Sequence, residues 1–347
     1  MGSLPWICFL VLVVLLLGLD LGVLNRKPHA ISAGEAMRWT LLWVALALTF
    51  NVVIGLVYEY KLFGIGQRFG SPISGRHAAL QFFTAYVVEE ALSIDNLFVM
   101  AMVFRYFRVP DAYQHRVLFF GILGALVFRG LFIGGGLAFI HLFEWAVYVF
   151  GAVLLYTAIK MLIAKEEAMH PEKNVWVRAM HRLFPFTHDY HGDRFFVRIE
   201  GKRMATPLCM ALVLIEGSDI VFAVDSVPAV FGVTRDPFIA FTSNVFAILG
   251  LRSLYFAIAA AMNSFRYIKV SLVLVLGFVG AKMLLTHHLP IGSGVSLAVI
   301  VSLLGAGVLT SLLVKTKPAP PHAPLSSKLA SEANASSTPD REPGKLR

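Results

Sequence analysis

The stretch VVEEALSIDNLF, residues 87–98, decides how this chain can fold. It carries the carboxylates of Glu89, Glu90 and Asp95 beside the amide of Asn96, yet apolar sequence flanks it on both sides. A helix of about 20 apolar residues crosses a hydrocarbon layer of about 30 Å. The stretch therefore predicts a membrane-spanning helix with acidic groups near its centre.

The composition of the whole chain is that of a polytopic membrane protein. Of its 347 residues, 57% are hydrophobic and only 15% are charged, whereas soluble domains are less apolar. The apolar runs do not alternate, and backbone polar groups in lipid must be satisfied within their own segment, so we predict an all-α transmembrane bundle. About nine helices are expected, at residues 4–24, 38–58, 78–104, 116–140, 144–164, 205–231, 237–261, 267–286 and 293–314.

Two segments have a different composition. Residues 165–204 form a charged loop, and residues 315–347, rich in Pro, Ala and Ser, are predicted to be a disordered tail. The transmembrane domain is thus expected over residues 1–314. Its first helix lacks a positive n-region and a cleavage site, so we interpret it as a retained anchor.

The net charge of +9 reflects membrane topology. When the loops are placed alternately on two sides, most of the 30 Lys and Arg residues fall on one side, as in the positive-inside pattern. This predicts a multi-pass protein of the cell inner (plasma) membrane with its N-terminus outside and its C-terminus in the cytoplasm. Topology accounts for the basic face, and no nucleic-acid partner is expected.

An internal repeat relates the third and sixth predicted helices. EEALSIDNLFV, starting at residue 89, aligns with DIVFAVDSVPA, starting at residue 219. The alignment matches Glu89 with Asp219, Asp95 with Asp225, and Asn96 with Ser226.

The following helices match in the same order. Arg129 aligns with Arg252, and Lys160 aligns with Lys282. Each repeat, at about residues 78–164 and 205–286, has three helices, so the second copy would enter the membrane from the opposite side. Inverted repeats of this kind are typical of transporters that bind substrate near the midplane.

The predicted charge balance in the membrane is negative. A charged side chain at the centre of a spanning helix costs about 2.5 to 3.5 kcal/mol on insertion scales. Arg129 and Arg252 can offset at most two of the acids, which leaves a net charge near minus four and favours a divalent cation. The six acids are Glu89, Glu90, Asp95, Glu216, Asp219 and Asp225.

The donor atoms narrow the choice of cation. Carboxylates, amide oxygens and hydroxyls are hard ligands suited to Mn²⁺, Mg²⁺ or Ca²⁺, and no His or Cys accompanies them to select Zn²⁺ or Cu⁺. The candidate metal ligands are Glu89, Asp95, Asn96, Glu216, Asp219, Asp225 and Ser226.

Four neighbouring residues receive supporting roles. Arg129 and Arg252 are expected to orient carboxylates, and Glu90 to ligate the ion, pair with an arginine or face a polar cavity. Pro228 lacks an amide hydrogen, so it is predicted to kink or unwind its helix beside Asp225.

Two long motifs carry a resemblance to a known family. EEALSIDNLFVMAMVFRYFRVPDAYQHRVLFFGILGALVFRGLF and ATPLCMALVLIEGSDIVFAVDSVPAVFGVTRDPFIAFTSNVFAILGLRSLYF closely resemble the TerC/Alx family of bacterial integral membrane proteins, over about residues 5–312. The resemblance implies a tellurium-resistance label, a place among exporters built on inverted three-helix repeats, and, for some members, Mn²⁺ export or supply.

The same resemblance implies functional positions in this chain. The family's acidic positions carry over onto Glu89, Asp95, Glu216, Asp219 and Asp225, with Asn96, Ser226 and Asn244 in the adjoining motifs. One departure is Glu90, where the family pattern often has Lys. An extra negative charge there could change metal affinity or selectivity.

Together these observations predict a transporter that moves Mn²⁺, or a similar hard divalent cation, out of the cytoplasm. The sequence contains no nucleotide-binding motif of the form GxxxxGK[ST]. No prosthetic cofactor is expected. The alternative is a membrane scaffold that binds metal or partner proteins without transport, in a metallation or tellurite-resistance complex. An intramembrane aspartyl enzyme is not expected, because the chain lacks a GxGD signature.

Overall fold

The computed structural model describes residues 3–19, 33–62, 73–163, 174–187, 189–199, 201–259, 268–286, 288 and 291–313. The chain divides into two units, Met1–Leu313 and Val314–Arg347, and all of the described residues belong to the first. The predicted disordered tail lies outside the described residues.

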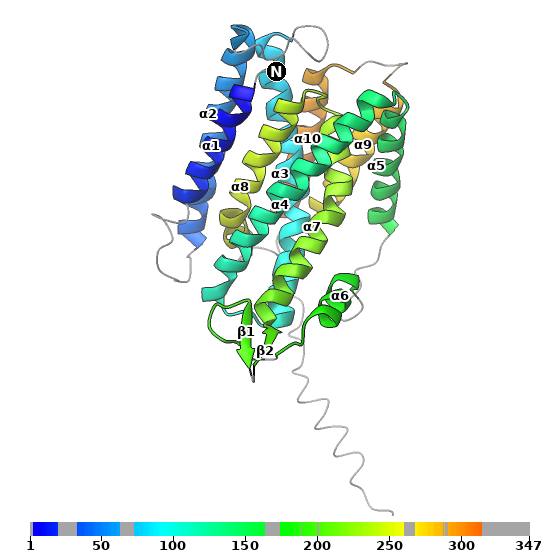
Figure 1. Ribbon diagram of the computed structural model, residues 1–347. Coiled ribbons are helices and arrows are strands. Elements are labelled where there is room, and N and C mark those ends of the chain that lie inside the picture. The colour runs from blue at the N-terminus through cyan, green and yellow to red at the C-terminus, as the bar shows by residue number, and fades with distance from the viewer. Residues whose placement is uncertain are drawn as a thin grey trace, which may run out of the picture. The chain divides into compact units, whose positions relative to one another are not determined.

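A long helix occupies each apolar segment that the sequence indicates. These helices are α1 (Ser3–Leu19), α2 (Ala33–Glu59), α3 (Gly75–Phe107), α4 (Asp111–Leu142), α5 (Ala146–Ile163), α7 (Pro207–Phe231), α8 (Pro237–Ala259), α9 (Ile268–Leu284) and α10 (Ser293–Leu313). They run up and down along one bundle (Figure 1).

Six described helices are both long and apolar enough to cross a membrane: α2, α4, α5, α7, α8 and α10. Helix α1 is apolar but has only 17 residues, and α9 also has 17. Helix α3 has 33 residues, but it falls outside the set because it carries the acidic stretch and further charges near its ends. The protein is thus a multi-pass helical membrane protein.

Helices α3, α4 and α5 form one group of three, and α7, α8 and α9 form a second. The two groups, or triplets, pack across one another. Helix α3 packs on α8 and α4 packs on α7, while α3 also contacts α7, α4 contacts α8, and α5 lies along α9. Helix α7 begins at the end of the bundle where α3 finishes, so α7, α8 and α9 run opposite to α3, α4 and α5 (Figure 1).

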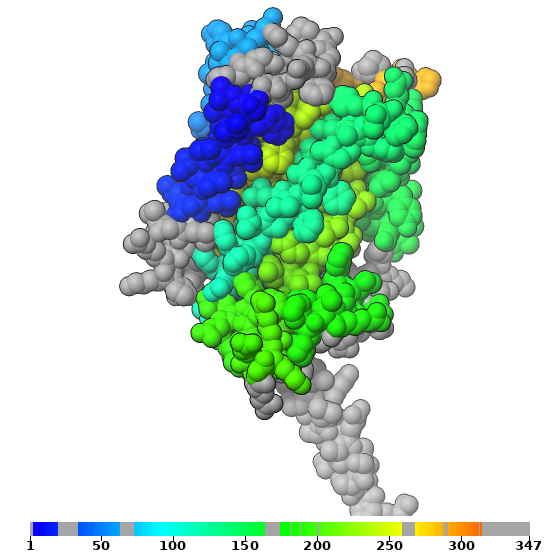
Figure 2. Space-filling model, in the orientation of Figure 1, coloured from blue at the N-terminus to red at the C-terminus, as the bar shows by residue number. Residues whose placement is uncertain are grey.

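The distribution of apolar side chains fits a lipid environment. Helix α8 is the most enclosed candidate span, whereas α2 and α10 are mostly exposed. Figure 2 shows α4 crossing one face of the bundle. The side chains of Leu123, Val127 and Leu131 on this helix are exposed. Exposed apolar surface of this extent is expected where lipid tails replace water.

A small folded segment lies within residues 165–204, which the sequence indicates as a charged loop long enough to fold modestly. It contains α6 (Val175–Leu183) and an antiparallel hairpin of β1 (Phe196–Ile199) and β2 (Lys202–Ala205), which turns at Gly201 with a φ of 78°. Side-chain capping supports both helices that flank the hairpin. Asn174 accepts from the amide of Trp176 at 2.9 Å, and Thr206 accepts from the amide of Cys209 at 3.4 Å.

Helices α5 and α9 approach each other through glycine. A Cβ atom on Gly280 would lie 3.0 Å from the carbonyl oxygen of Gly151, and a Cβ atom on Gly151 would lie 3.0 Å from that of Gly280. Small residues at such a crossing let helix backbones pack closely in lipid.

We therefore expect Gly280→Leu to destabilise the bundle. The side chain would meet backbone atoms that cannot move aside, and overpacking of this kind costs about 1 to 3 kcal/mol. Gly277→Leu on the same helix is the matched control, because a Cβ atom there has no neighbour within 4 Å. Chemical unfolding in detergent micelles measures both; equal losses for the two variants would contradict the close crossing.

Candidate functional site

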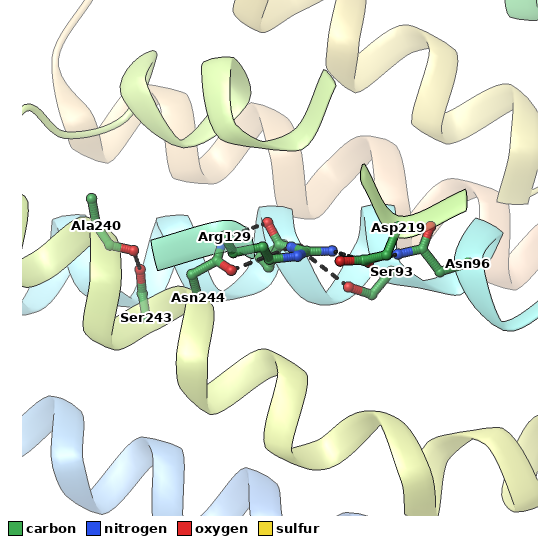
Figure 3. Close-up of polar contacts among 8 residues, drawn as sticks. Ser93, Asn96, Arg129, Asp219, Ala240, Ser243 and Asn244 are labelled. Carbon is green, nitrogen blue, oxygen red and sulfur yellow. Dashed lines mark hydrogen bonds and ion pairs between the residues drawn. The ribbon is translucent and has the colours of Figure 1, made fainter. Parts of the chain in front are cut away.

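A buried arginine joins the two groups of helices. Arg129 on α4 is 2% exposed and forms an ion pair with Glu89 on α3, which has no exposed surface. Its Nη2 atom also lies 3.2 Å from Oδ1 of Asp219 on α7, and its Nη1 atom donates to Asn244 on α8 at 3.3 Å. Figure 3 shows the Arg129 side chain between Asn244 and Asp219.

Amides and a hydroxyl complete this cluster. Asn244 donates to Oε2 of Glu89 at 2.8 Å, and Asn96 donates to Oδ1 of Asp219 at 2.9 Å. Ser93 donates to Oε1 of Glu89 at 3.3 Å. Each carboxylate thus shares Arg129 and receives a neutral donor as well, which is how a low-dielectric interior tolerates buried charge.

A cavity of about 260 Å³ lies beside the cluster. Asp95 and Asn96 of α3 line it together with Asp225 and Ser226 of α7, and Arg129 reaches its wall. The repeat alignment matches Asp95 with Asp225 and Asn96 with Ser226, so both matched pairs line this cavity.

Two residues of the cavity lining have a buried oxygen atom without a hydrogen-bond partner among the described residues: Asn96 (Oδ1) and Ser226 (Oγ). Oδ2 of Asp219, whose Oδ1 accepts from Asn96, is also buried without such a partner. Unpartnered buried polar atoms cost free energy, and in native proteins they point to a water, an ion or a functional role. All three atoms are hard donors of the kind that Mn²⁺ or Ca²⁺ accepts.

The carboxylates do not converge on one point. Among the residues that the structure describes, no three His, Cys, Asp or Glu side chains lie close enough together to hold a metal ion. Glu89 and Asp219 instead share Arg129, and Asp95 and Asp225 line the cavity. A cation in the cavity would therefore depend on two carboxylates plus the neutral oxygens of Asn96 and Ser226.

Helix α5 contributes two residues that the sequence analysis did not place in the site. Thr157 donates to Oδ1 of Asp225 at 2.6 Å, and Lys160 also lines the cavity. The charge balance near minus four that the sequence predicts does not include Lys160, so that predicted value is too negative. The only available signal was the repeat match of Lys160 with Lys282.

Two of the six carboxylates point elsewhere. The carboxylate of Glu216 lies directly over Gly124 on α4, and Oε1 of Glu90 lies 3.9 Å from the Cβ position of Gly250 on α8. Neither residue is in the described cavity lining. Metal ligation by Glu216 stays a prediction, and the Glu90 carboxylate lies near α8.

The expected unwinding at Pro228 is not observed. Helix α7 is continuous from Pro207 to Phe231 with Pro228 inside it. The helix still brings Asp225 to the cavity, because α5 and α3 approach it there and supply Thr157 and Asp95. Arg252 is buried on α8 and lies outside the described lining of this cavity.

The shared ion pair makes a direct prediction. Arg129→Met should lower the free energy of unfolding by about 3 to 5 kcal/mol, because two carboxylates would stay buried without their base. Adding Glu89→Gln should restore part of this loss. Arg116→Met is the control: its ion pair with Asp193 is 40% and 54% exposed and should contribute less than about 1 kcal/mol. Equal losses for Arg116→Met and Arg129→Met in detergent unfolding would argue against the shared pair.

The chain is similar to bacterial membrane proteins over most of its length. The chain is 45% identical to "Uncharacterized membrane protein STKORF319" of Myxococcus xanthus over 315 residues, 91% of this chain and 93% of the relative. It is 43% identical to "Putative membrane-bound redox modulator Alx" of Salmonella typhi over 312 residues, 89% of this chain and 92% of the relative. No solved structure matches the chain significantly. Residues 74–319 match the model of the integral membrane protein TerC family, and the chain belongs to that family.

Proposed function

We propose that this protein transports a hard divalent cation, with Mn²⁺ as the leading candidate, out of the cytoplasm through the cavity beside Arg129. The observation that carries the proposal is that four residues with oxygen-bearing side chains line this cavity from two matched helices. Asp95 and Asn96 come from α3, and Asp225 and Ser226 come from α7.

The local charge favours a cation over an anion. Glu89, Asp95, Asp219 and Asp225 contribute four negative charges, and Arg129 and Lys160 contribute two positive charges. Lys269 on α9, which interacts electrostatically with Asp95, contributes a third positive charge, so one negative charge remains. An acidic site in a low-dielectric interior attracts a cation and repels an oxyanion such as tellurite.

The helix arrangement supports alternating access. Helices α3 to α5 run opposite to α7 to α9, as two inverted repeats would (Figure 1). The packing of α3 on α8 mirrors the packing of α4 on α7. If the two triplets rock against each other, the cavity between α3, α5 and α7 would open to one side of the membrane at a time. We propose that the end carrying α6 faces the cytoplasm of an inner-membrane protein, and that no enzymatic step is involved.

The name of the Salmonella typhi relative refers to redox modulation. This chain has two cysteines, and both are free: Cys8 is exposed on α1, and Cys209 is buried on α7. A cysteine pair is therefore not the basis of our proposal, which rests on oxygen ligands.

A second candidate function is a metal-binding scaffold that docks partner proteins without transport. It is favoured by the folded segment of α6 and the hairpin, which exposes the apolar side chains of Val175 and Leu183. Such a protein would bind Mn²⁺ at the same cavity but would not release it on the other side.

Proteoliposomes with a Mn²⁺-sensitive dye inside test the proposal. Asp95→Asn and Asp225→Asn should each reduce Mn²⁺ flux by about tenfold or more, as loss of a ligand weakens binding. Glu144→Gln, an exposed carboxylate between α4 and α5, is the matched control and should transport normally.

The outcomes separate the hypotheses. Normal flux in both Asp95→Asn and Asp225→Asn would remove the site assignment. Saturable Mn²⁺ binding by the wild-type protein with no flux would favour the scaffold.

A further inference from the structure

Two cavities outside the cation site meet at the last residue of α7. One has a volume of about 420 Å³ and the other about 390 Å³, and Phe231 lines both. On α5, Val147 lines the first cavity, and Phe150, about one helical turn further on, lines the second. The two cavities are therefore neighbours, and neither is lined by Asp95 or Asp225.

The first cavity, which we name the basic cavity, carries a net positive charge. It lies at the end of the bundle where α7 and α9 finish and α5 and α8 begin (Figure 1). Arg235, Lys282 and Asp236 line it, and two bases against one acid leave one positive charge. Oδ1 of Asp236 already accepts the amides that begin α8, Phe238 at 2.9 Å and Ile239 at 3.1 Å.

The basic cavity also offers a neutral donor. Thr234 donates to Oε1 of Gln81 at 2.9 Å, and both residues line the cavity. This bond orients the Gln81 amide and leaves its amino group as a donor. A phosphate oxygen is a suitable acceptor for this group and for the two bases.

The second cavity, which we name the apolar cavity, lies between α4, α5 and α7. Every described residue that lines it is apolar, and its wall includes Leu131 and Val224, which are 68% and 46% exposed. The cavity is therefore reached from the lipid-facing surface. Gly135 contributes to the lining, and a Cβ atom there would meet nothing within 4 Å.

We propose that the two cavities together bind one anionic phospholipid, with its phosphate in the basic cavity and an acyl chain in the apolar cavity. Arginine and lysine side chains pair with phosphate oxygens. The basic cavity lies at the bundle end opposite α6, where lipid headgroups are expected. A free anion would leave the apolar cavity unused, and an apolar molecule would have no use for Arg235 and Lys282.

The position of this site gives it a structural consequence. A lipid held there would contact α4 and α7 on one side and α5 and α9 on the other. It would therefore stabilise one arrangement of these helices. The proposal goes beyond cation transport and does not depend on it, because the two sites share no charged lining residue.

Native mass spectrometry of the purified protein with added phosphatidylglycerol tests the proposal. The double variant Arg235→Gln/Lys282→Gln should bind this lipid about tenfold more weakly or worse, because it removes two headgroup contacts. Gly135→Leu should weaken binding to a similar extent by filling the apolar cavity.

Two matched controls accompany these variants. Lys202→Gln/Arg203→Gln removes two exposed bases from the hairpin, and Gly134→Leu changes a neighbouring glycine that also has open space but does not line the apolar cavity. Both should bind phosphatidylglycerol as the wild-type protein does.

Three results would overturn the proposal. The first is unchanged binding in the double variant or in Gly135→Leu. The second is equal binding of phosphatidylcholine and phosphatidylglycerol by the wild-type protein. The third is thermal stabilisation by inorganic phosphate alone that equals the effect of phosphatidylglycerol, which would indicate a free-anion site.

Discussion

The ion pairs of Arg129 with Glu89 and Asp219 are the interaction on which the rest of the site depends. Inside a bilayer there is no water to solvate a lone charge, so each of these three groups requires the others. Because Arg129 comes from α4 and the two acids come from α3 and α7, the ion pairs join helices from both triplets. Asn244 and Asn96 add donors from α8 and α3, so the cluster ties four helices together.

The same cluster explains how one acidic region can serve two purposes. Arg129 offsets one of the two negative charges of Glu89 and Asp219, and the neutral donors Asn244, Asn96 and Ser93 hydrogen-bond to these carboxylates. Asp95 and Asp225 line an adjacent cavity, where Asn96 and Ser226 still have buried oxygens without partners. The ion-pair cluster thus joins the helices, while neighbouring acids on α3 and α7 line the cavity.

Glycine residues in the bundle occur both where two helices touch and where a cavity lies beside a helix. At Gly151 and Gly280 the backbones of α5 and α9 touch, and no side chain could be added there without displacement. At Gly135 no helix covers the missing side chain, and an apolar cavity faces the lipid instead. A glycine therefore permits close packing where another helix lies against it, and it contributes to a cavity where no helix does.

The amino-acid sequence by itself determined that the chain forms membrane helices, because apolar length and backbone satisfaction in lipid leave few alternatives. It also identified Glu89, Asp95, Asp219 and Asp225 as matched positions and indicated hard oxygen ligands. Helical periodicity shows which side chains share a face, but it does not show which helix packs on that face. Only the tertiary structure therefore decided that Glu216 lies against α4 and that Thr157 and Lys160 of α5 lie at the same cavity as Asp225. It also decided that Glu89 and Asp219 both pair with Arg129.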